Sequence, residues 1–317
     1  MVIPPLRQPA APWEKPAPRP EEQLLQAGTR GLRKLEQEGD AANLSDVELL
    51  GLEAVVLLVV RPALFVTGGD FVSPPAPWGA LLDQQRASIR RIAPSVGRIE
   101  VSFGFGESQM IGTGFLVAPD VVMTNRHVVK NFSELDQGTW RFMGGMTPAI
   151  DYRAERGSTA RASFQLVEIL AVHDSLDLAL VRVSSEATHG HPAPGPLSLT
   201  SMPSESLVGR NVYVIGYPAS DNQGLTPPQV LRDIFGSVYQ VKRLQPGKVL
   251  EVEAGQPIFT HDCSTLGGNS GSCVVDLETG RVIGLHFRGH YRHANYAVAL
   301  WQLADDPMLK SAGVRFD

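Results

Sequence analysis

Short apolar runs separated by turn residues fill the chain from Pro94 to Leu300, and this pattern restricts the fold more than any other feature of the sequence. The runs are short and rich in β-branched residues, as strands are. They form two groups of about six, which predicts a mainly β protein built from two antiparallel six-stranded β-barrels. The predicted strands are residues 99–105, 113–117, 120–124, 165–172 and 178–183, then 212–217, 237–241, 249–252, 272–275, 282–287 and 296–300.

The two groups of strands define one predicted domain of residues 95–317. The first barrel is predicted at about residues 95–185 and the second at about 205–300, followed by a C-terminal helix at 301–312.

The sequence before this domain has a different composition and a different spacing of apolar residues. Residues 1–20 are rich in proline, which predicts a flexible or extended tail. Leucines then recur at helical spacing, Ser45 and Glu48 have the spacing of a capping box, and a further helix is predicted at 78–92. We therefore expect a helical N-terminal region at residues 21–94. Its simplest role is a cap that stabilises the barrels, and its alternative role is regulatory, through the cleft or through a docked protein partner.

The charge and hydropathy patterns exclude two classes of partner. The net charge of −5 is mild and the basic residues form no stripe, so we expect no nucleic acid partner. The longest apolar stretch, residues 49–60, contains Glu53 and is shorter than the roughly 20 residues that a membrane span requires. We therefore expect no membrane association.

The cysteine content indicates a compartment. Cys263 and Cys273 are the two cysteines of a chain of 317 residues, and so low a number favours free thiols in a reducing environment. One disulfide bridge between them is the alternative. The first residues also lack the basic and then apolar order of a secretory signal. Both features predict a cytoplasmic protein.

A candidate nucleophile lies in the segment Gly-Gly-Asn-Ser-Gly-Ser that ends at Ser272. Glycines on both sides of Ser270 allow the sharp turn that exposes a hydroxyl and turns backbone N–H groups inward. In that geometry the amides of Gly268 and Ser270 form an oxyanion hole. An ordinary hairpin loop is the alternative for this segment.

A base and a carboxylate are available elsewhere in the chain. His127 follows an apolar strand in Thr-Asn-Arg-His-Val-Val, and Asp177 begins the apolar segment Asp-Leu-Ala-Leu-Val-Arg-Val. A serine hydroxyl becomes a nucleophile when an imidazole accepts its proton and a carboxylate orients that imidazole. A capped or core histidine and a turn aspartate are the alternatives. Asp174 is a second candidate for the acid, but Asp177 directly precedes the strand.

These three segments, in the order His, Asp, Ser, resemble the signature blocks of trypsin-like peptidases. The resemblance implies the chymotrypsin-like double barrel, a catalytic triad of His127, Asp177 and Ser270 in the cleft between the barrels, and a peptide or protein substrate. No cofactor is implied, and the histidines at 286, 290 and 293 lack the companions of a usual zinc site. The predicted function is therefore that of a serine endopeptidase.

The segment around Ser270 is most similar to bacterial glutamyl endopeptidases, which favours a bacterial source. That resemblance implies that Thr265 and His286 line the primary specificity pocket and receive an acidic side chain. Ser264 stands where trypsin carries its aspartate, so a preference for basic residues is disfavoured. Arg288 lies at the predicted pocket mouth, either to assist a carboxylate or simply solvated. A pocket for small or apolar residues is the alternative.

A binding protein is the competing functional class. A pseudo-protease would keep the double barrel as a protein-binding module without turnover. A latent enzyme that awaits a partner is a third hypothesis, and it predicts an intact triad beside a distorted loop at residues 267–270.

Overall fold

The computed structural model describes residues 61–317 except 105–107, 188–189, 202–206, 221–227 and 291–293, together with Arg30, Lys34 and Ser45. The proline-rich tail and the helices predicted between residues 21 and 60 lie outside the described residues. The chain divides into two compact units, Met1–Val55 and Val56–Asp317, and the described strands all belong to the second. None of the described helices has the length and hydrophobicity that a transmembrane helix requires.

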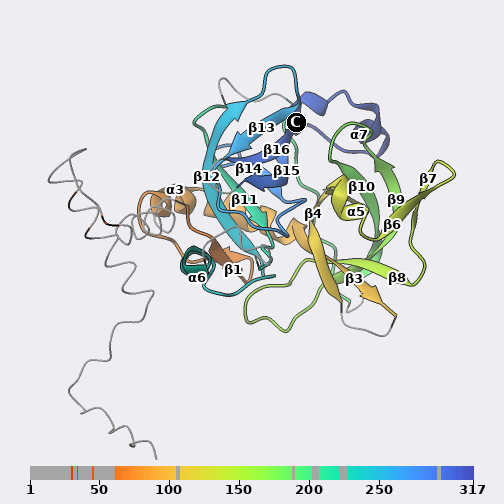
Figure 1. Ribbon diagram of the computed structural model, residues 1–317, viewed down its shortest axis with the longest axis horizontal. Coiled ribbons are helices and arrows are strands. Elements are labelled where there is room, and N and C mark those ends of the chain that lie inside the picture. The colour runs from red at the N-terminus through yellow and green to blue at the C-terminus, as the bar shows by residue number, and fades with distance from the viewer. Residues whose placement is uncertain are drawn as a thin grey trace, which may run out of the picture. The chain divides into compact units, whose positions relative to one another are not determined.

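The first barrel is a closed antiparallel sheet with the strand order β10-β5-β4-β3-β8-β9, on the right of Figure 1. Its interior is filled by apolar side chains from alternate strand positions, including Ile99, Leu116 and Phe164, all fully buried. Strand β8 and the hairpin of β6 and β7 were not predicted. The strands are β3 Val96–Phe103, β4 Gln109–Ala118, β5 Val121–Thr124, β6 Ser133–Asp136, β7 Thr139–Phe142, β8 Met146–Asp151, β9 Ser163–Val172 and β10 Ala179–Ala187.

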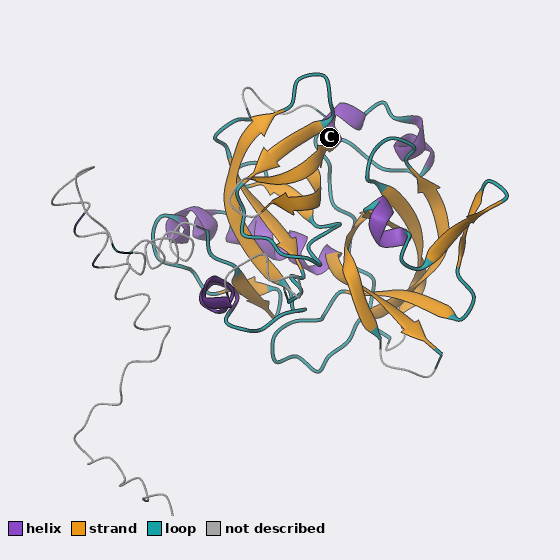
Figure 2. Ribbon diagram, viewed as in Figure 1, coloured by secondary structure: helices purple, strands orange, loops and turns teal. Residues whose placement is uncertain are grey.

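The second barrel has the order β11-β14-β15-β16-β13-β12 and closes through pairing of β11 with β12 (Figures 1 and 2). The predicted mainly β fold of two six-stranded antiparallel barrels is therefore confirmed. The strands are β11 Asn211–Gly216, β12 Arg243–Val252, β13 Ile258–His261, β14 Cys273–Asp276, β15 Val282–His290 and β16 Ala294–Ala299.

One predicted strand of this barrel is wrong. Residues 237–241 form no strand, because Ser237 and Gln240 have φ values of 54° and 58°, which a strand does not accommodate. The sixth strand of the barrel is instead β13, which was not predicted and has the short sequence Ile-Phe-Thr-His.

The segment before the first barrel differs from the predicted helical region at residues 64–71, which form strands β1 Leu64–Thr67 and β2 Asp70–Phe71. Strand β1 pairs with β12, so it extends the sheet of the second barrel. The helix predicted at 78–92 is present as two helices, α3 Trp78–Gln84 and α4 Arg86–Ile92, which meet at Gln85. The 3-10 helix Ala93–Ser95 then leads into β3.

Three further α-helices and one 3-10 helix complete the described fold. Helix α5, Arg126–Val129, follows β5 directly, and α6, Pro228–Phe235, precedes β12. The predicted C-terminal helix at 301–312 is present as a 3-10 helix, Leu300–Leu303, and α7, Pro307–Ser311. The side chain of Asp306 caps α7 by accepting hydrogen bonds from the Met308 and Leu309 amides.

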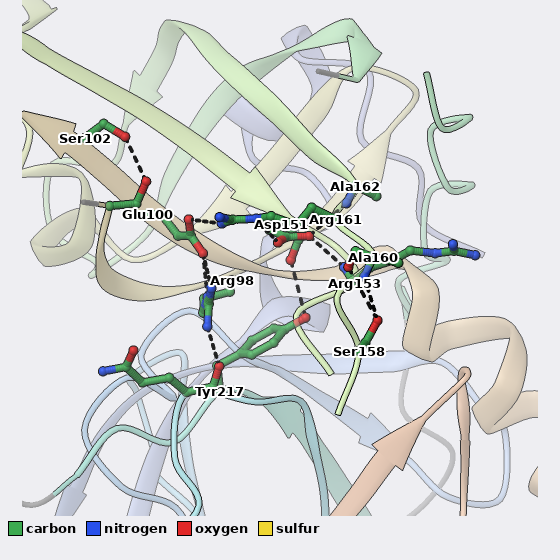
Figure 3. Close-up of polar contacts among 12 residues, drawn as sticks. Arg98, Glu100, Ser102, Asp151, Arg153, Ser158, Ala160, Arg161, Ala162 and Tyr217 are labelled. Atoms are coloured by element: carbon green, nitrogen blue, oxygen red, sulfur yellow. Dashed lines mark hydrogen bonds and ion pairs between the residues drawn. The ribbon is translucent and has the colours of Figure 1, made fainter. Parts of the chain in front are cut away.

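Polar contacts join the two barrels beside Tyr217, which follows β11. Its hydroxyl lies 3.3 Å from the Val96 carbonyl and 3.4 Å from the Asp151 carbonyl, both in the first barrel. Figure 3 shows this ring below a network in which the buried Glu100 carboxylate accepts from the guanidinium groups of Arg98 and Arg161. The network fixes the first barrel against the loop that follows β11.

Candidate active site

His127 and Asp177 come together because their strands are neighbours. Strands β5 and β10 pair with Thr124 opposite Ala179, so the residues just beyond these positions meet at one end of the first barrel. His127 Nδ1 lies 2.6 Å from Asp177 Oδ2, and the His127 backbone N–H donates to Asp177 Oδ1 at 2.9 Å. Asp174 contributes its backbone carbonyl to Arg126 instead.

The carboxylate of Asp177 is held in its ionised form. Burial raises its pKa, but hydrogen bonds from the His127 side chain and backbone, with electrostatic interactions with His127 and Arg126, lower the pKa below its ordinary value overall. Asn125 also donates to the Asp177 backbone carbonyl at 2.8 Å. An ionised carboxylate only accepts hydrogen bonds, so Nδ1 of His127 carries a proton and Nε2 of the neutral ring has a free lone pair.

Ser270 lies in the loop between β13 and β14, where the backbone requires glycine. Gly268 and Gly271 have φ values of 87° and 89°, which lie in the left-handed region. A Cβ atom on Gly271 would also lie 1.9 Å from the Thr113 carbonyl oxygen. The two glycines therefore permit both the turn and the close approach of β4 to this loop.

The backbone N–H groups of this loop fall into two sets. Those of Asn269, Gly271 and Ser272 donate to the carbonyls of Leu266, His286 and Asn269, respectively. Those of Gly268 and Ser270 donate to no residue in the described part of the chain. They are the two amides predicted to form the oxyanion hole.

The orientation of the Gly268 amide follows from its peptide plane. The Gly267 carbonyl accepts a hydrogen bond from the Ala219 N–H at 2.6 Å. The N–H and C=O of a trans peptide point in opposite directions, so the Gly268 N–H faces away from Ala219.

The helix that carries His127 packs near the Ser270 loop. A Cβ atom on Gly112 would lie 2.8 Å from a Val128 methyl group and 3.1 Å from the Ser270 carbonyl oxygen. Gly112 therefore lies between the helix and the loop, at a position with no room for a side chain. No hydrogen bond joins the Ser270 hydroxyl to the His127 ring, both of which belong to the described residues. Such bonds are often long in unliganded enzymes and shorten when substrate binds.

His286 lies in β15 and is buried against a second histidine. Its Nδ1 is 3.2 Å from His261 Nε2. Burial lowers the pKa of His261 to about 3. Burial, followed by the nearby His261 and His127, lowers the pKa of His286 well below its ordinary value. Both rings are therefore neutral at pH 7.

One backbone amide sets the tautomers of this pair. The Cys263 N–H donates to His261 Nδ1 at 3.4 Å, so the proton of neutral His261 is on Nε2. His261 then donates to His286 Nδ1, which leaves the His286 proton on Nε2. His286 thus has one N–H donor that the histidine pair does not use.

Thr265 is held by Asn295, a residue that the sequence analysis did not single out. The Asn295 side chain donates to the Cys263 carbonyl at 2.7 Å, which fixes its oxygen toward Thr265 at 2.6 Å. An amide oxygen only accepts, so the Thr265 hydroxyl gives its proton to Asn295. The available signal was a polar residue in the otherwise apolar strand Ala-Asn-Tyr-Ala-Val-Ala.

The two other residues assigned to the specificity pocket have different surroundings. The Ser264 hydroxyl donates to the Arg61 carbonyl at 2.7 Å, and the Arg61 guanidinium forms an ion pair with Asp262. The segment before β1 therefore contacts the predicted pocket base. Arg288 is exposed and pairs with Tyr296 through the backbone of β15 and β16.

Two alternatives concern cysteines and metals. Both cysteines are buried free thiols, and burial raises the pKa of Cys273 to about 12 and that of Cys263 well above its ordinary value. Neither thiol is therefore activated as a nucleophile. No group of three or more metal-ligating side chains occurs among the described residues, which include His286 but neither His293 nor the His290 side chain.

Comparison with known families and proteins gives a consistent result. Residues 112–285 match the family described as "Trypsin-like peptidase domain". A "Probable serine protease" of Lysobacter enzymogenes is 30% identical over 330 residues, covering 93% of this chain and 83% of the relative. A serine protease of Mycobacterium tuberculosis is 26% identical over 244 residues, covering 74% of this chain and 52% of the relative.

A glutamyl endopeptidase of Staphylococcus aureus is 28% identical over 190 residues, covering 59% of this chain and 50% of that protein. The chain thus spans about half the length of the M. tuberculosis and S. aureus relatives. Among solved structures, an active-form protease of M. tuberculosis aligns with a TM-score of 0.47 at 21% identity, over 76% of this chain and 89% of that one.

Proposed function

The chain belongs to the trypsin-like peptidases and is a serine endopeptidase, and we propose that it cleaves peptide bonds through an acyl-enzyme on Ser270. In this proposal His127 is the base and Asp177 orients it. One observation carries the assignment of the site. The amides of Gly268 and Ser270 are free among the described residues while their neighbours are bonded, beside a histidine held by an ionised aspartate.

The first half of the reaction forms the acyl-enzyme. The Ser270 oxygen attacks the carbonyl carbon of the scissile bond while Nε2 of His127 takes the hydroxyl proton. Asp177 accepts from Nδ1–H and stabilises the imidazolium. The carbonyl oxygen becomes an oxyanion that accepts from the Gly268 and Ser270 amides, and losing one such donor typically costs about a hundredfold or more in rate. The C–N bond then breaks, and His127 returns the proton to the leaving amine.

The second half of the reaction repeats this chemistry with water. His127 takes a proton from water, which attacks the ester carbonyl through a second oxyanion in the same site. The C–O bond breaks, Ser270 regains its proton, and the carboxylic acid product leaves. The same two amides therefore serve both halves of the reaction.

A preference for an acidic residue before the scissile bond is the finer part of the proposal. The N–H that His286 retains at Nε2 supports it, since an imidazole N–H can donate to a carboxylate. Arg288 is exposed and carries a positive charge for the same side chain. Because the Thr265 hydroxyl gives its proton to Asn295, His286 is the principal uncharged hydrogen-bond donor that the proposed pocket offers to a substrate carboxylate. A relative named glutamyl endopeptidase also supports the preference.

Regulation by the N-terminal region or by a protein partner is a further part of the proposal. Its support is the contact of the Arg61 carbonyl with Ser264, which links the N-terminal side of the chain to the predicted specificity pocket. Removal of residues 1–55, which form the first of the two units of the chain, is expected to raise the turnover number if these residues restrain the enzyme. Equal activity of the full and shortened chains would contradict this part.

A cytoplasmic location is proposed as well. Its support is the pair of free thiols, which suits a reducing compartment. Fractionation of cells that produce the protein, with detection in the soluble cytoplasmic fraction, is the expected result. Recovery from the culture medium would contradict it.

A peptide library separates these hypotheses. The native protein and its Ser270→Ala variant are incubated with proteome-derived peptides, and the products are identified by mass spectrometry. Cleavage after glutamate or aspartate by the native protein alone is expected. Cleavage after small or apolar residues would contradict the acidic preference but would agree with the assignment as a peptidase. Cleavage by neither protein would favour a latent enzyme or a binding module.

A further inference from the structure

Thr113 is a fully buried residue of β4, in the first barrel, whose hydrogen bonds reach across to the second. Its backbone N–H donates to the Ser270 carbonyl at 2.8 Å, and its hydroxyl donates to the Gly268 carbonyl at 2.8 Å. The same hydroxyl accepts from the Tyr217 N–H at 3.2 Å. One threonine therefore contacts both carbonyls that belong to the residues of the proposed oxyanion hole.

The direction of the hydroxyl bond is set by its partners. Carbonyl oxygens only accept, so the hydroxyl proton must point at Gly268. The Tyr217 amide only donates and occupies a lone pair of the same oxygen. The Thr113 hydroxyl thus acts as both a donor and an acceptor, and it connects the loop after β11 to the loop of the candidate nucleophile.

These bonds restrain the two peptide planes on either side of Gly268. The plane before it is held by the Ala219 N–H on the Gly267 carbonyl, and the plane after it by the Thr113 hydroxyl. A glycine at a φ of 87° has wide conformational freedom, so its amide is directed by such external bonds. The Gly268 N–H lies in the plane before Gly268, and the plane after it also carries the Asn269 N–H that donates to Leu266. Loss of the Thr113 bond loosens that second plane, and rotation about the backbone bonds of Gly268 then allows its N–H to turn away from a developing oxyanion.

We propose that Thr113 is a positioning residue that holds the Gly268 amide in the orientation required for the oxyanion hole. This inference rests on the proposed function of Ser270 and its neighbouring amides. Thr113 does not contact the substrate in this proposal, because it acts through the Gly268 carbonyl. The first barrel thereby supports the oxyanion hole as well as carrying the base and the acid.

A series of variants at this position tests the proposal. Thr113→Val removes the hydroxyl and keeps the branched shape, Thr113→Ser restores the hydroxyl, and Thr113→Cys offers a weaker donor. The matched control is Thr124→Val, since the Thr124 hydroxyl donates to the Thr113 carbonyl at 2.7 Å and does not contact Gly268. Melting temperatures of all the variants report whether each one folds.

The kinetic expectation follows from where the interaction acts. Thr113→Val is expected to lower kcat about tenfold to a hundredfold with KM nearly unchanged, because oxyanion stabilisation is realised in the transition state. Thr113→Ser is expected to recover most of the activity, with Thr113→Cys between the two. Thr124→Val is expected to retain kcat within about threefold even where its melting temperature falls, as for other changes that cost stability alone.

Labelling by a fluorophosphonate separates the two proposals. Rapid labelling of the native protein and slow labelling of Thr113→Val supports the inference, because phosphonylation also develops charge on an oxygen in the hole. Equal labelling rates, or equal losses of kcat in the Thr113→Val and Thr124→Val variants, would overturn the inference and leave the function of Ser270 standing. No labelling of the folded native protein would overturn both. If Thr113→Val does not fold, equal kcat in the Ser and Cys variants would overturn the inference.

Discussion

Single hydrogen bonds with only one permitted direction organise the candidate site at the residue scale. The Asp177 carboxylate accepts from His127, so the protonated ring nitrogen is Nδ1. The Cys263 carbonyl accepts from Asn295, so the Asn295 oxygen faces Thr265. In both cases a group that can only accept determines the role of the next group. The site therefore arranges its donors before any substrate binds.

Replacing Asp177 by asparagine is expected to lower kcat about ten-thousandfold, because a side-chain amide that donates to Nδ1 stabilises the wrong imidazole tautomer. Steady-state kinetics on a peptide substrate measure the loss. Asp174→Asn is the matched control and is expected to retain kcat within about twofold, since Asp174 contributes a backbone carbonyl rather than its carboxylate. A comparable loss in both variants would contradict the assignment of the acid.

Asn295→Ala is expected to raise the preference for glutamate over glutamine before the scissile bond. The variant frees the Thr265 hydroxyl proton, which can then donate to a carboxylate. Hydrogen bonds to charged groups contribute about 1.5–3 kcal/mol, so the ratio of kcat/KM values for the two substrates is expected to rise about tenfold to a hundredfold. The ratio cancels any general loss of activity. An unchanged ratio would mean that Thr265 does not contact the substrate side chain.

At the scale of elements, β1 adds a strand to the second barrel and covers a buried cation. Arg243, which is 1% exposed, donates to the Ala63 carbonyl at 2.8 Å, and its guanidinium lies 3.4 Å from the centre of the Phe65 ring. Burial lowers the pKa of Arg243 to about 10. A desolvated guanidinium is costly unless neighbouring acceptors and rings compensate for the lost water. We therefore regard β1 as part of the folded second barrel.

Phe65→Ala is expected to lower the free energy of unfolding by about 2 kcal/mol, because it removes apolar contact and the ring that faces Arg243. Urea denaturation measures the change. Val72→Ala, at a position that is 85% exposed, is the control and is expected to stay within about 0.5 kcal/mol of the native protein. If both variants have native stability, β1 is not an integral part of the barrel.

At the scale of the whole molecule, the buried histidine pair connects stability to pH. The pKa of His261 is about 3 in the folded protein, below its ordinary value of 6.5, so between these values the unfolded chain binds more protons than the folded one. Stability is therefore complete above about pH 6.5 and falls as the pH decreases toward 3. His286, whose pKa is also lowered, acts in the same direction.

Each such histidine is expected to contribute about 1.4 kcal/mol per pH unit within that window. His261→Gln removes one titrating group, so its free energy of unfolding is expected to fall less steeply than that of the native protein between pH 6.5 and 4.5. Denaturation at a series of pH values measures the slope. At pH 8 both forms of His261 are neutral, so the difference in the free energy of unfolding between the variant and the native protein reports only the packing cost of the substitution. This value serves as the internal control. Parallel curves would contradict the role of His261.

Much of the fold was predictable because strands depend on local patterns. The apolar runs at 113–117, 212–217 and 282–287 alternate with turn residues, and all three lie within or across observed strands. Strand β13 was missed because its four residues lack a distinctive pattern. Residues 237–241 resembled a strand by composition, but Ser237 and Gln240 adopt left-handed backbone angles, which composition does not reveal.

The candidate site was predictable where adjacent residues carry the chemistry. A glycine-framed serine, a histidine after a strand and an aspartate before one are visible in sequence order. The partners of Thr113 and Asn295 were not visible, because Thr113 meets Gly268 and Ser270 across more than half of the domain and Asn295 meets Thr265 from another strand. Their roles remain proposals that rest on these contacts.

The sequence by itself determined the two-barrel architecture, the family and the candidate serine, histidine and aspartate, because hydrophobic alternation and glycine-dependent turns act between near neighbours in the chain. Tertiary structure decided which amides are free, which tautomer His286 adopts and that β1 belongs to the second barrel. Those outcomes depend on the direction of single hydrogen bonds and on strand register, which are set only when distant segments pack together.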